Sequence, residues 1–168
     1  MRAIRSVLVL LAALALTLAA GCSSSPGTTP PAPADQGLAF TSRTLEGAAF
    51  DGRSLAGRPA VLWFWAPWCS VCRAEAPTIA RAAAQHPEVT FIGVAALDQV
   101  PAMQQFVATQ QLGGFRHLAD TDTSVWRRFG ITQQPAFAFV APDGSVEVVK
   151  TTLSEPDLAQ RLDALPRA

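Results

Sequence analysis

The sequence predicts an α/β domain with a mixed central sheet and helices on both of its faces. Two apolar runs of strand length, residues 60–66 and 88–97, are each followed by a segment whose apolar side chains have helical spacing. A third, β-rich stretch is divided by the turn-forming tripeptide Pro142-Asp143-Gly144, and the chain closes with another helical pattern. Strands that alternate with helices and end in a hairpin form a mixed sheet with helices on both sides.

The first half of the domain contains a hairpin, a strand and a helix in this prediction. Residues 38–52 hold two short extended segments and predict a hairpin or an edge element. Residues 60–66, AVLWFWA, are apolar throughout and suit a central strand buried on both faces. Residues 69–85 predict a helix, which Pro77 is expected to kink because it lacks a backbone N–H.

The next three elements follow the same alternation. Residues 88–97 predict a second buried strand, and residues 100–114 predict a helix closed by the pair Gly113-Gly114. Residues 115–120 predict a short strand or an extended link.

The C-terminal part predicts two further helices around a hairpin. Residues 121–130 predict a short helix with Thr121 or Thr123 as its N-cap. Residues 135–150 form the hairpin, and residues 154–165 read as a helix with a serine cap and a stripe of leucines.

The N-terminus has the pattern of a targeting segment. Arg2 and Arg5 precede an apolar run over residues 7–20, which is shorter than the roughly 20 residues that a membrane-spanning helix needs. Residues 1–21 are therefore expected to be a signal peptide, and a short membrane anchor is the alternative. The run ends in LAAGC, which resembles the lipobox of bacterial lipoproteins, with Cys22 as the lipidated residue; an ordinary signal peptide with an incidental cysteine stays open.

The rest of the chain divides into a stalk and one domain. Residues 22–37 are rich in Pro, Ser and Thr and are expected to form a disordered stalk, which would hold a domain of residues 38–168 at the extracytoplasmic face of the cell membrane. The chain has no net formal charge, which argues against a nucleic-acid partner.

Two of the three cysteines form a Cys-x-x-Cys pair at the start of a predicted helix. The unpaired N–H groups and the dipole of a helix N-terminus stabilise a thiolate, so Cys69 is expected to be reactive and Cys72 to lie one turn deeper. Half a zinc site is disfavoured because His86 and His117 lack ligand spacing, and no metal is expected. A purely structural disulfide would close too small a loop to constrain the chain much.

The segment FWAPWCSVC resembles the active site of the thioredoxin superfamily, which implies a thioredoxin-like fold. Trp68 before the cysteine pair, Glu75 and Pro77 after it, and the segment TQQPAFAFVAPDG are similar to the extracytoplasmic branch that contains the TlpA, ResA and CcmG proteins. The sequences VLWFWAPWC, LDQVPAMQ and TQQPAFAFV most resemble the actinobacterial DsbE/DsbF-type proteins. The resemblance covers nearly all of residues 38–165.

This resemblance implies roles for individual residues. Cys69 would be the attacking thiol and Cys72 the resolving one. Pro135 matches the cis-proline that faces the disulfide in the superfamily, whereas a trans, strand-opening proline is the expectation from base rates alone. Gln134 and Trp68 would line the substrate groove.

Glu75 matches a glutamate that tunes the thiols in the ResA-like branch. A carboxylate near a thiol disfavours the thiolate and can transfer its proton. The alternative is a solvated helical Glu paired with an Arg. Trp63 stands where thioredoxin has a buried Asp, so Glu75 is the candidate replacement. Because the side chain is taken as exposed or partly exposed, Glu75→Gln is expected to change the thiol titration and leave stability nearly unchanged.

The function that these features predict is membrane-tethered thiol–disulfide exchange that forms disulfides in exported proteins. The expected partners are exported proteins with thiols or disulfides and a membrane redox partner that resets the pair, and no cofactor is expected. The alternatives are a reductant of the ResA/CcmG type for apocytochrome c cysteines, a non-catalytic thioredoxin-fold binding module and a thiol peroxidase. Fold alone does not separate them.

Overall fold

The computed structural model describes residues 37–167 of the 168-residue chain. The predicted signal peptide, the lipidation site Cys22 and all of the predicted stalk except Gly37 lie outside the described residues. Within residues 37–167, no helix is long and apolar enough to cross a membrane.

The secondary structure follows the predicted alternation of strands and helices. The elements in chain order are β1 (Thr41–Arg43), β2 (Ala49–Asp51), the 3-10 helix η1 (Gly52–Leu55), β3 (Ala60–Trp65), α2 (Ser70–Gln85), β4 (Thr90–Ala95), α3 (Val100–Thr109), β5 (Arg116–Ala119), α4 (Ser124–Arg128), β6 (Ala136–Val140), β7 (Val146–Val149) and α5 (Glu155–Ala164).

The sheet is mixed, as predicted. Its five strands run in the order β5-β4-β3-β6-β7. Strand β3 is central: it pairs in parallel with β4 and antiparallel with β6. Strands β1 and β2 form a separate antiparallel hairpin, which confirms the predicted hairpin in that segment.

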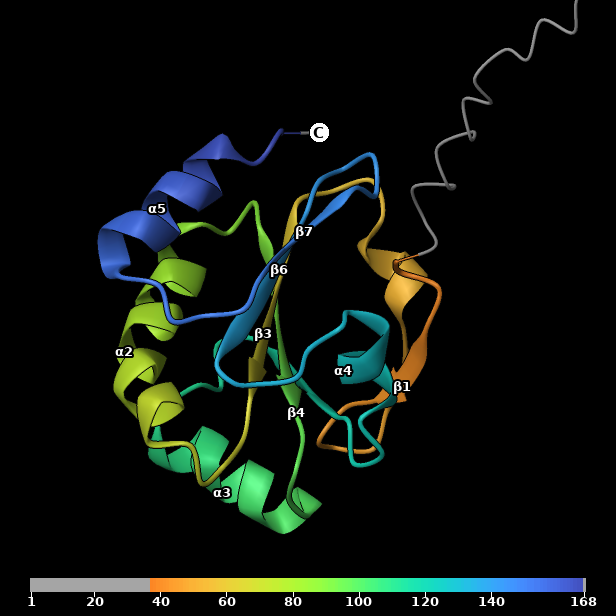
Figure 1. Cartoon of the computed structure of the whole chain (residues 1–168), viewed down its shortest axis with the longest axis vertical. Coiled ribbons are helices and arrows are strands. Elements are labelled where there is room, and N and C mark those ends of the chain that lie inside the picture. Colours follow the sequence, from red (N-terminus) through yellow and green to blue (C-terminus); the bar gives the residue numbers. More distant parts are fainter. Residues whose placement is uncertain (1–36, 168) are drawn as a thin grey trace, which may run out of the picture. The chain divides into compact units, whose positions relative to one another are not determined.

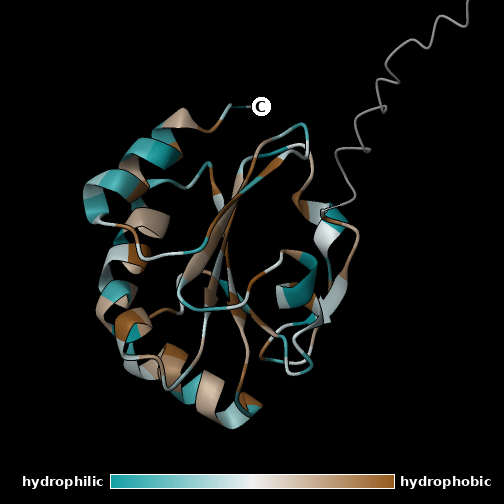
Figure 2. Ribbon diagram, in the orientation of Figure 1, coloured by the Kyte–Doolittle hydropathy of each residue, from teal (hydrophilic) through white to brown (hydrophobic). Residues whose placement is uncertain are grey.

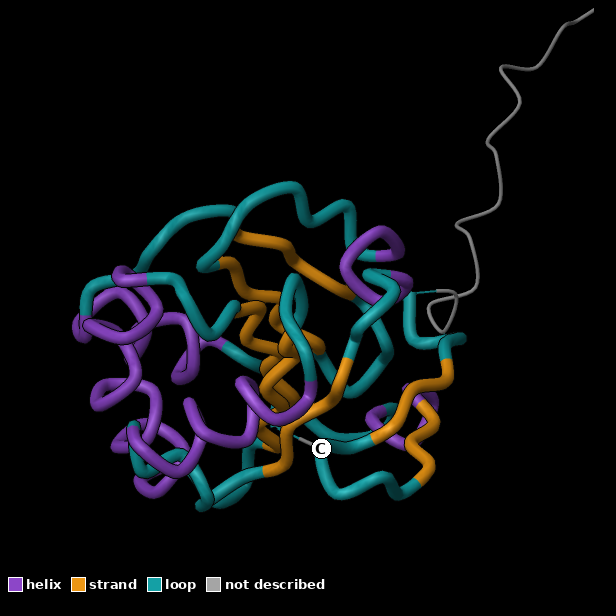
Figure 3. The backbone as a smooth tube through the Cα atoms, turned by 90° about the horizontal axis from the view of Figure 1, so that it is seen from below, coloured by secondary structure: helices purple, strands orange, loops and turns teal. Residues whose placement is uncertain are grey.

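Helices and loops cover both faces of the sheet (Figures 1 and 3). Side chains alternate along β3, so Val61, Trp63 and Trp65 pack in the cluster that contains the buried residues of α2, α3 and α5. Leu62 and Phe64 face the other side, where α4, η1 and the β1–β2 hairpin supply the apolar cover. In Figure 2 the strands are largely hydrophobic, whereas much of α5 is hydrophilic, as expected for a helix with one face in solvent.

Helix α3 ends earlier than the sequence predicted. Its last residue is Thr109, and Gln111, not a glycine, takes the left-handed conformation with φ 56°. The amide of Leu112 donates to the carbonyl of Val107 at 3.0 Å, the hydrogen bond of a Schellman motif. Leu112 is fully buried, and this apolar contact offsets the cost of a left-handed glutamine. The glycine pair therefore lies beyond the helix end.

The N-cap residue of α4 is one of the two predicted threonines, but the capping hydrogen bonds come from another residue. Thr123 occupies the N-cap position, but its hydroxyl makes no capping hydrogen bond. The carboxylate of Asp120 accepts instead from the backbone N–H groups of Val125 at 3.0 Å and Trp126 at 2.8 Å. The two oxygens of the buried Asp120 carboxylate thereby satisfy two helix-end donors at once.

Candidate active site

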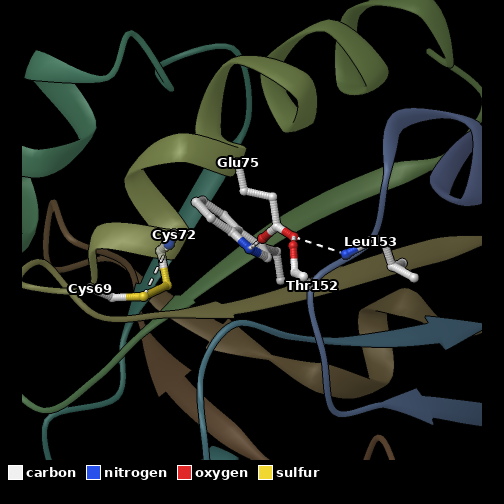
Figure 4. Close-up of a disulfide and its surroundings, with 6 residues drawn as sticks. Cys69, Cys72, Glu75, Thr152 and Leu153 are labelled. Atoms are coloured by element: carbon white, nitrogen blue, oxygen red, sulfur yellow. Dashed lines mark hydrogen bonds between the residues drawn. A yellow bond between two sulfur atoms is a disulfide. The ribbon is translucent and has the colours of Figure 1, made fainter.

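The cysteine pair lies at the N-terminus of α2, at the end of the sheet where β3 finishes. Cys69 is the N-cap residue, and its Sγ accepts from the backbone N–H of Cys72 at 3.0 Å. The two cysteines form a disulfide, with their Cα atoms 5.3 Å apart (Figure 4). The helix start thus directs an otherwise unpaired N–H at the sulfur of Cys69, the arrangement that stabilises a thiolate there once the disulfide is reduced.

The two cysteines differ in their access to solvent. Cys69 keeps 6% of its surface exposed, whereas Cys72 is 0% exposed. An incoming thiolate needs access to the sulfur that it attacks. The half of the disulfide that reaches the surface is therefore the Cys69 half.

An exposed apolar surface surrounds this half of the disulfide. Trp68, Val71 and Leu97 are the large hydrophobic side chains that stay exposed among the described residues. The indole Nε1 of Trp68 donates to the carbonyl of Leu97 at 3.1 Å, and Leu97 has a φ of 63°, unusual for a bulky residue. A cleft of about 490 Å³ lies beside Trp68 and runs toward α3.

The Gln134–Pro135 peptide bond is cis, as the resemblance implied and against the base rate for X-Pro bonds. Pro135 directly precedes β6, and the next residue, Ala136, pairs with Phe64 near the end of β3. Pro135 therefore lies at the same end of the sheet as the disulfide. It is buried, and Gln134 beside it is partly exposed.

Glu75 lies one turn beyond Cys72 on α2, and its side chain is buried with 6% exposure. Its Oε2 accepts from Trp63 Nε1 at 3.1 Å. Its Oε1 accepts from the Thr152 hydroxyl at 2.6 Å and from the Leu153 N–H at 3.1 Å (Figure 4). The expectation that this side chain is exposed or partly exposed was wrong. The alternative, a solvated Glu paired with an Arg, does not describe the site either, because the partners are neutral donors.

Burial and hydrogen bonding act in opposite directions on the charge of Glu75. Removal from water raises the pKa of this carboxyl above its ordinary value, and the hydrogen bonds from Thr152, Leu153 and Trp63 lower it in part. The net result is a raised pKa. The site therefore holds a carboxyl group that takes up a proton more readily than a solvated glutamate does.

The sequence analysis did not predict the three hydrogen-bond partners of Glu75. Thr152 and Leu153 follow the hairpin and lie 77 and 78 residues from Glu75 along the chain. Trp63 was noted only because it stands where thioredoxin has a buried Asp. Its indole N–H is the hydrogen-bond donor that β3 provides to Glu75. Only the tertiary packing of α2 against β3 and the β7–α5 connection brings these groups together. Among residues 37–167, no cluster of His, Cys, Asp and Glu could hold a metal ion.

Comparison with known proteins gives the family. The model of the AhpC/TSA family matches residues 33–149, most of the chain. The chain belongs to the AhpC/TSA family. Within this family of thioredoxin-fold proteins it is 44% identical, over 156 residues, to the soluble secreted antigen MPT53 of Mycobacterium tuberculosis, an alignment that covers 91% of this chain and 88% of the relative. It is 28% identical to the thiol-disulfide oxidoreductase ResA of Halalkalibacterium halodurans, over 70% of this chain and 67% of that protein.

Two solved structures are similar to this chain in both fold and sequence. The structure of M. tuberculosis DsbF, in mixed oxidised and reduced forms, superposes with a TM-score of 0.77 at 57% identity and covers 78% of this chain and 98% of that one. A secreted M. tuberculosis disulfide oxidoreductase, described as homologous to E. coli DsbE, gives a TM-score of 0.74 at 47% identity and covers 78% and 99%. This AhpC/TSA member is a thiol–disulfide oxidoreductase with a thioredoxin-like fold and Cys69–Cys72 as its cysteine pair.

Proposed function

We propose that this oxidoreductase is tethered to the extracytoplasmic face of the cell membrane and forms disulfides in exported proteins. The observation that carries the proposal is the Cys69–Cys72 pair at a helix N-terminus, within disulfide distance, with only the Cys69 half reaching the surface. Its 57% identity to mycobacterial DsbF, solved in oxidised and reduced forms, supports the redox role of the pair, and its 47% identity to a secreted disulfide oxidoreductase supports the compartment.

In this proposal Cys69 is the sulfur that substrates attack. A substrate thiolate forms a bond to Cys69 Sγ, the Cys69–Cys72 bond breaks, and Cys72 leaves as a thiolate. A second thiolate of the substrate then attacks the mixed disulfide at the substrate sulfur, and Cys69 leaves as a thiolate. Two electrons pass from the substrate to the enzyme pair, and the two protons lost by the substrate thiols balance those that the enzyme thiols take up. A membrane redox partner must then reoxidise the pair.

Trp68, Gln134 and Pro135 are proposed to form the substrate groove. Trp68 and Leu97 offer exposed apolar surface beside Cys69. Pro135 and Gln134 lie at the same end of the sheet, where an extended substrate could pair with the backbone. These features favour an unfolded or extended segment of substrate around the target cysteine.

Glu75 is proposed to handle the proton of Cys72. Cys72 is fully buried, so a thiolate released there is costly until it is protonated. Glu75 lies one turn away on the same helix, with a raised pKa. A carboxyl with that property can give its proton to a nearby thiolate and take one back from solvent.

The domain organisation remains part of the proposal. Residues 1–21 would be removed as a signal peptide, Cys22 would carry the lipid, and residues 22–37 would form the stalk of a domain at 38–168. Mass spectrometry of Cys22 in protein from the native membrane fraction tests this arrangement. A lipid-modified N-terminal Cys22 supports it, and soluble protein that lacks Cys22 contradicts it.

The reductant of the ResA/CcmG type is the second candidate, favoured by the 28% identity to ResA. The reduction potential of the Cys69–Cys72 couple separates the two, because about 30 mV is a tenfold change in a two-electron equilibrium. We propose to measure this potential by equilibrating the domain with glutathione. In a second assay, a protein whose native disulfides have been reduced is refolded in the presence of the oxidised enzyme. An oxidant has a potential well above that of thioredoxin, about −270 mV, and restores the substrate disulfides stoichiometrically. A potential at or below that value, with no oxidation, would establish the reductant instead.

A further inference from the structure

Thr152 connects the buried carboxyl of Glu75 to the protein surface. Thr152 is exposed, yet its hydroxyl donates to Glu75 Oε1 at 2.6 Å, the shortest of the three hydrogen bonds to this carboxylate. Figure 4 shows the carboxylate directed at Thr152 and Leu153, on the β7–α5 connection. The buried end of this link is Glu75, and the exposed end is a residue far from the disulfide in the sequence.

We propose that Thr152 is a positioning residue for the exchange reaction: its hydroxyl is the port through which Glu75 gains and loses its proton. The proposal rests on the role proposed for Glu75 above and adds the route by which that role is served.

The chemistry of the three partners singles out Thr152. The indole N–H of Trp63 and the backbone N–H of Leu153 donate and cannot accept. A hydroxyl both donates and accepts. When Glu75 carries a proton, the Thr152 oxygen is therefore the one acceptor among these partners. Rotation of this single hydroxyl group changes Thr152 from a donor to the carboxylate into an acceptor from the carboxylic acid.

The route leads to an open cleft at the surface. Thr152 and Leu153 line a depression of about 700 Å³ between β7 and α5. Its charged lining groups are Glu147, Asp157 and Arg161.

Two of these charges neutralise each other, because Arg161 pairs with Glu147 at 2.6 Å. The Asp157 carboxylate accepts a hydrogen bond from the neutral Ser154 hydroxyl at 2.6 Å. On its own helix Glu75 follows Cys72 and the N-cap Cys69, and from β3 the neutral Trp63 faces it. Among the described partners of Glu75, Thr152 is the one whose side-chain hydroxyl links the carboxyl to this cleft.

Each transfer balances without any redox change. A hydronium ion in the cleft gives a proton to Thr152 Oγ1 while the original hydroxyl proton of Thr152 passes to Glu75 Oε1. The products are water, an unchanged threonine and a neutral carboxylic acid. The reverse sequence returns the proton to water, so Thr152 is restored in both directions.

The test compares Thr152→Val, which has the same shape without the hydroxyl, with Thr152→Ser, which keeps it. Thr151→Val is the matched control, because this neighbouring exposed threonine lines the same cleft and makes no hydrogen bond to Glu75. The Glu75 carboxyl carbon is followed by ¹³C NMR through a pH titration of the oxidised protein. Denaturation midpoints confirm that each variant is folded.

We expect Thr152→Val to raise the pKa of Glu75 by about one unit, a tenfold change in its acid equilibrium, because a charge-assisted hydrogen bond is lost. We also expect the carboxyl resonance of this variant to broaden at its titration midpoint, because proton exchange slows. Thr152→Ser and Thr151→Val should titrate sharply, as the wild type does. An unshifted, sharp titration in Thr152→Val would overturn the proposal.

The role of Glu75 is tested separately by the pH profile of thiol–disulfide exchange. If Thr152 acts through Glu75, Thr152→Val shifts this profile in the wild type and has no further effect in the Glu75→Gln background. A profile that Glu75→Gln leaves unchanged would refute the role of Glu75, while the NMR titration would still decide whether Thr152 is its proton port. An additional shift by Thr152→Val in the Glu75→Gln background would refute the route through Glu75.

Discussion

Replacement of Glu75 by Gln tests how a buried carboxyl is accommodated beside the cysteine pair. The neutral acid form fits its surroundings: one oxygen accepts from Trp63, and the other accepts from Leu153 while its proton points to Thr152. A glutamine cannot do the same. With its oxygen toward Leu153, its NH₂ group faces the Trp63 N–H; with the amide flipped, the NH₂ faces the Leu153 N–H. Either orientation leaves one buried donor without an acceptor.

The size of the effect follows from that single unpaired donor. A buried polar group that loses its partner costs about 1–3 kcal/mol, so at low pH we expect Glu75→Gln to be less stable than the wild type by this amount. The difference in stability between the wild type and Glu75→Gln then narrows with rising pH. The folded-state pKa of Glu75 is raised by burial, so its contribution to stability is complete below the unfolded pKa of about 4.3 and is lost as pH rises through the folded value. Each unit by which the folded-state pKa exceeds the unfolded one removes about 1.4 kcal/mol from the free energy of unfolding of the wild type once the pH is above the folded value.

Urea denaturation of the oxidised protein at a series of pH values from 4 upward measures both effects. Glu155→Gln is the control, because Glu155 is exposed and its ion pair with Arg81 is a surface pair worth about 1 kcal/mol or less. We expect the stability curves of wild type and Glu75→Gln to converge as pH rises. Equal stability at pH 4, or two parallel curves, would show that the hydrogen bonds to Glu75 do not have the energetic role assigned to them.

Three further outcomes are expected. Alkylation of the reduced domain at mildly acidic pH labels Cys69 before Cys72, as peptide mapping will show; preferential labelling of Cys72 reverses the assignment. Gly93→Ala lowers the denaturation midpoint by the equivalent of about 1–3 kcal/mol, since a Cβ there meets the ring of His117; an unchanged midpoint contradicts this packing. Asp120→Asn costs about 1–3 kcal/mol in the same assay because one of two helix-end N–H groups loses its acceptor, and a neutral result would assign the capping elsewhere.

The sequence predicted the sheet well because its strands are unambiguous. Residues 60–66 are apolar without interruption, and a strand with that pattern has to be buried on both faces, as β3 is. The position of Cys69 at a helix start followed from the motif, and the structure places it at the N-cap. The cis bond before Pro135 followed from the family resemblance alone, since base rates favour trans.

The surroundings of Glu75 could not be predicted in this way. Helical spacing put the residue on the cysteine side of α2, but burial depends on what packs over it, and Thr152 and Leu153 come from the other end of the chain. The end of α3 was missed for a related reason: a buried Leu112 decided which residue takes the left-handed conformation. Local propensity favoured the glycines, and tertiary packing overrode it.

The charge balance around the cysteine pair links its redox state to protons. Breaking the disulfide releases a thiolate at Cys72, which has no exposed surface, one helical turn from Glu75. Two buried negative charges close to each other repel, so the proposed role of Glu75 requires that the carboxyl is protonated when the Cys72 thiolate forms. In the oxidised state, the hydrogen bonds from the neutral donors Trp63, Thr152 and Leu153 reduce the energetic cost of burying the carboxylate charge. The raised pKa of Glu75 lets this carboxyl carry a proton when the thiolate forms. A carboxylate held by an arginine would lose this property, because the ion pair would keep it charged in both states.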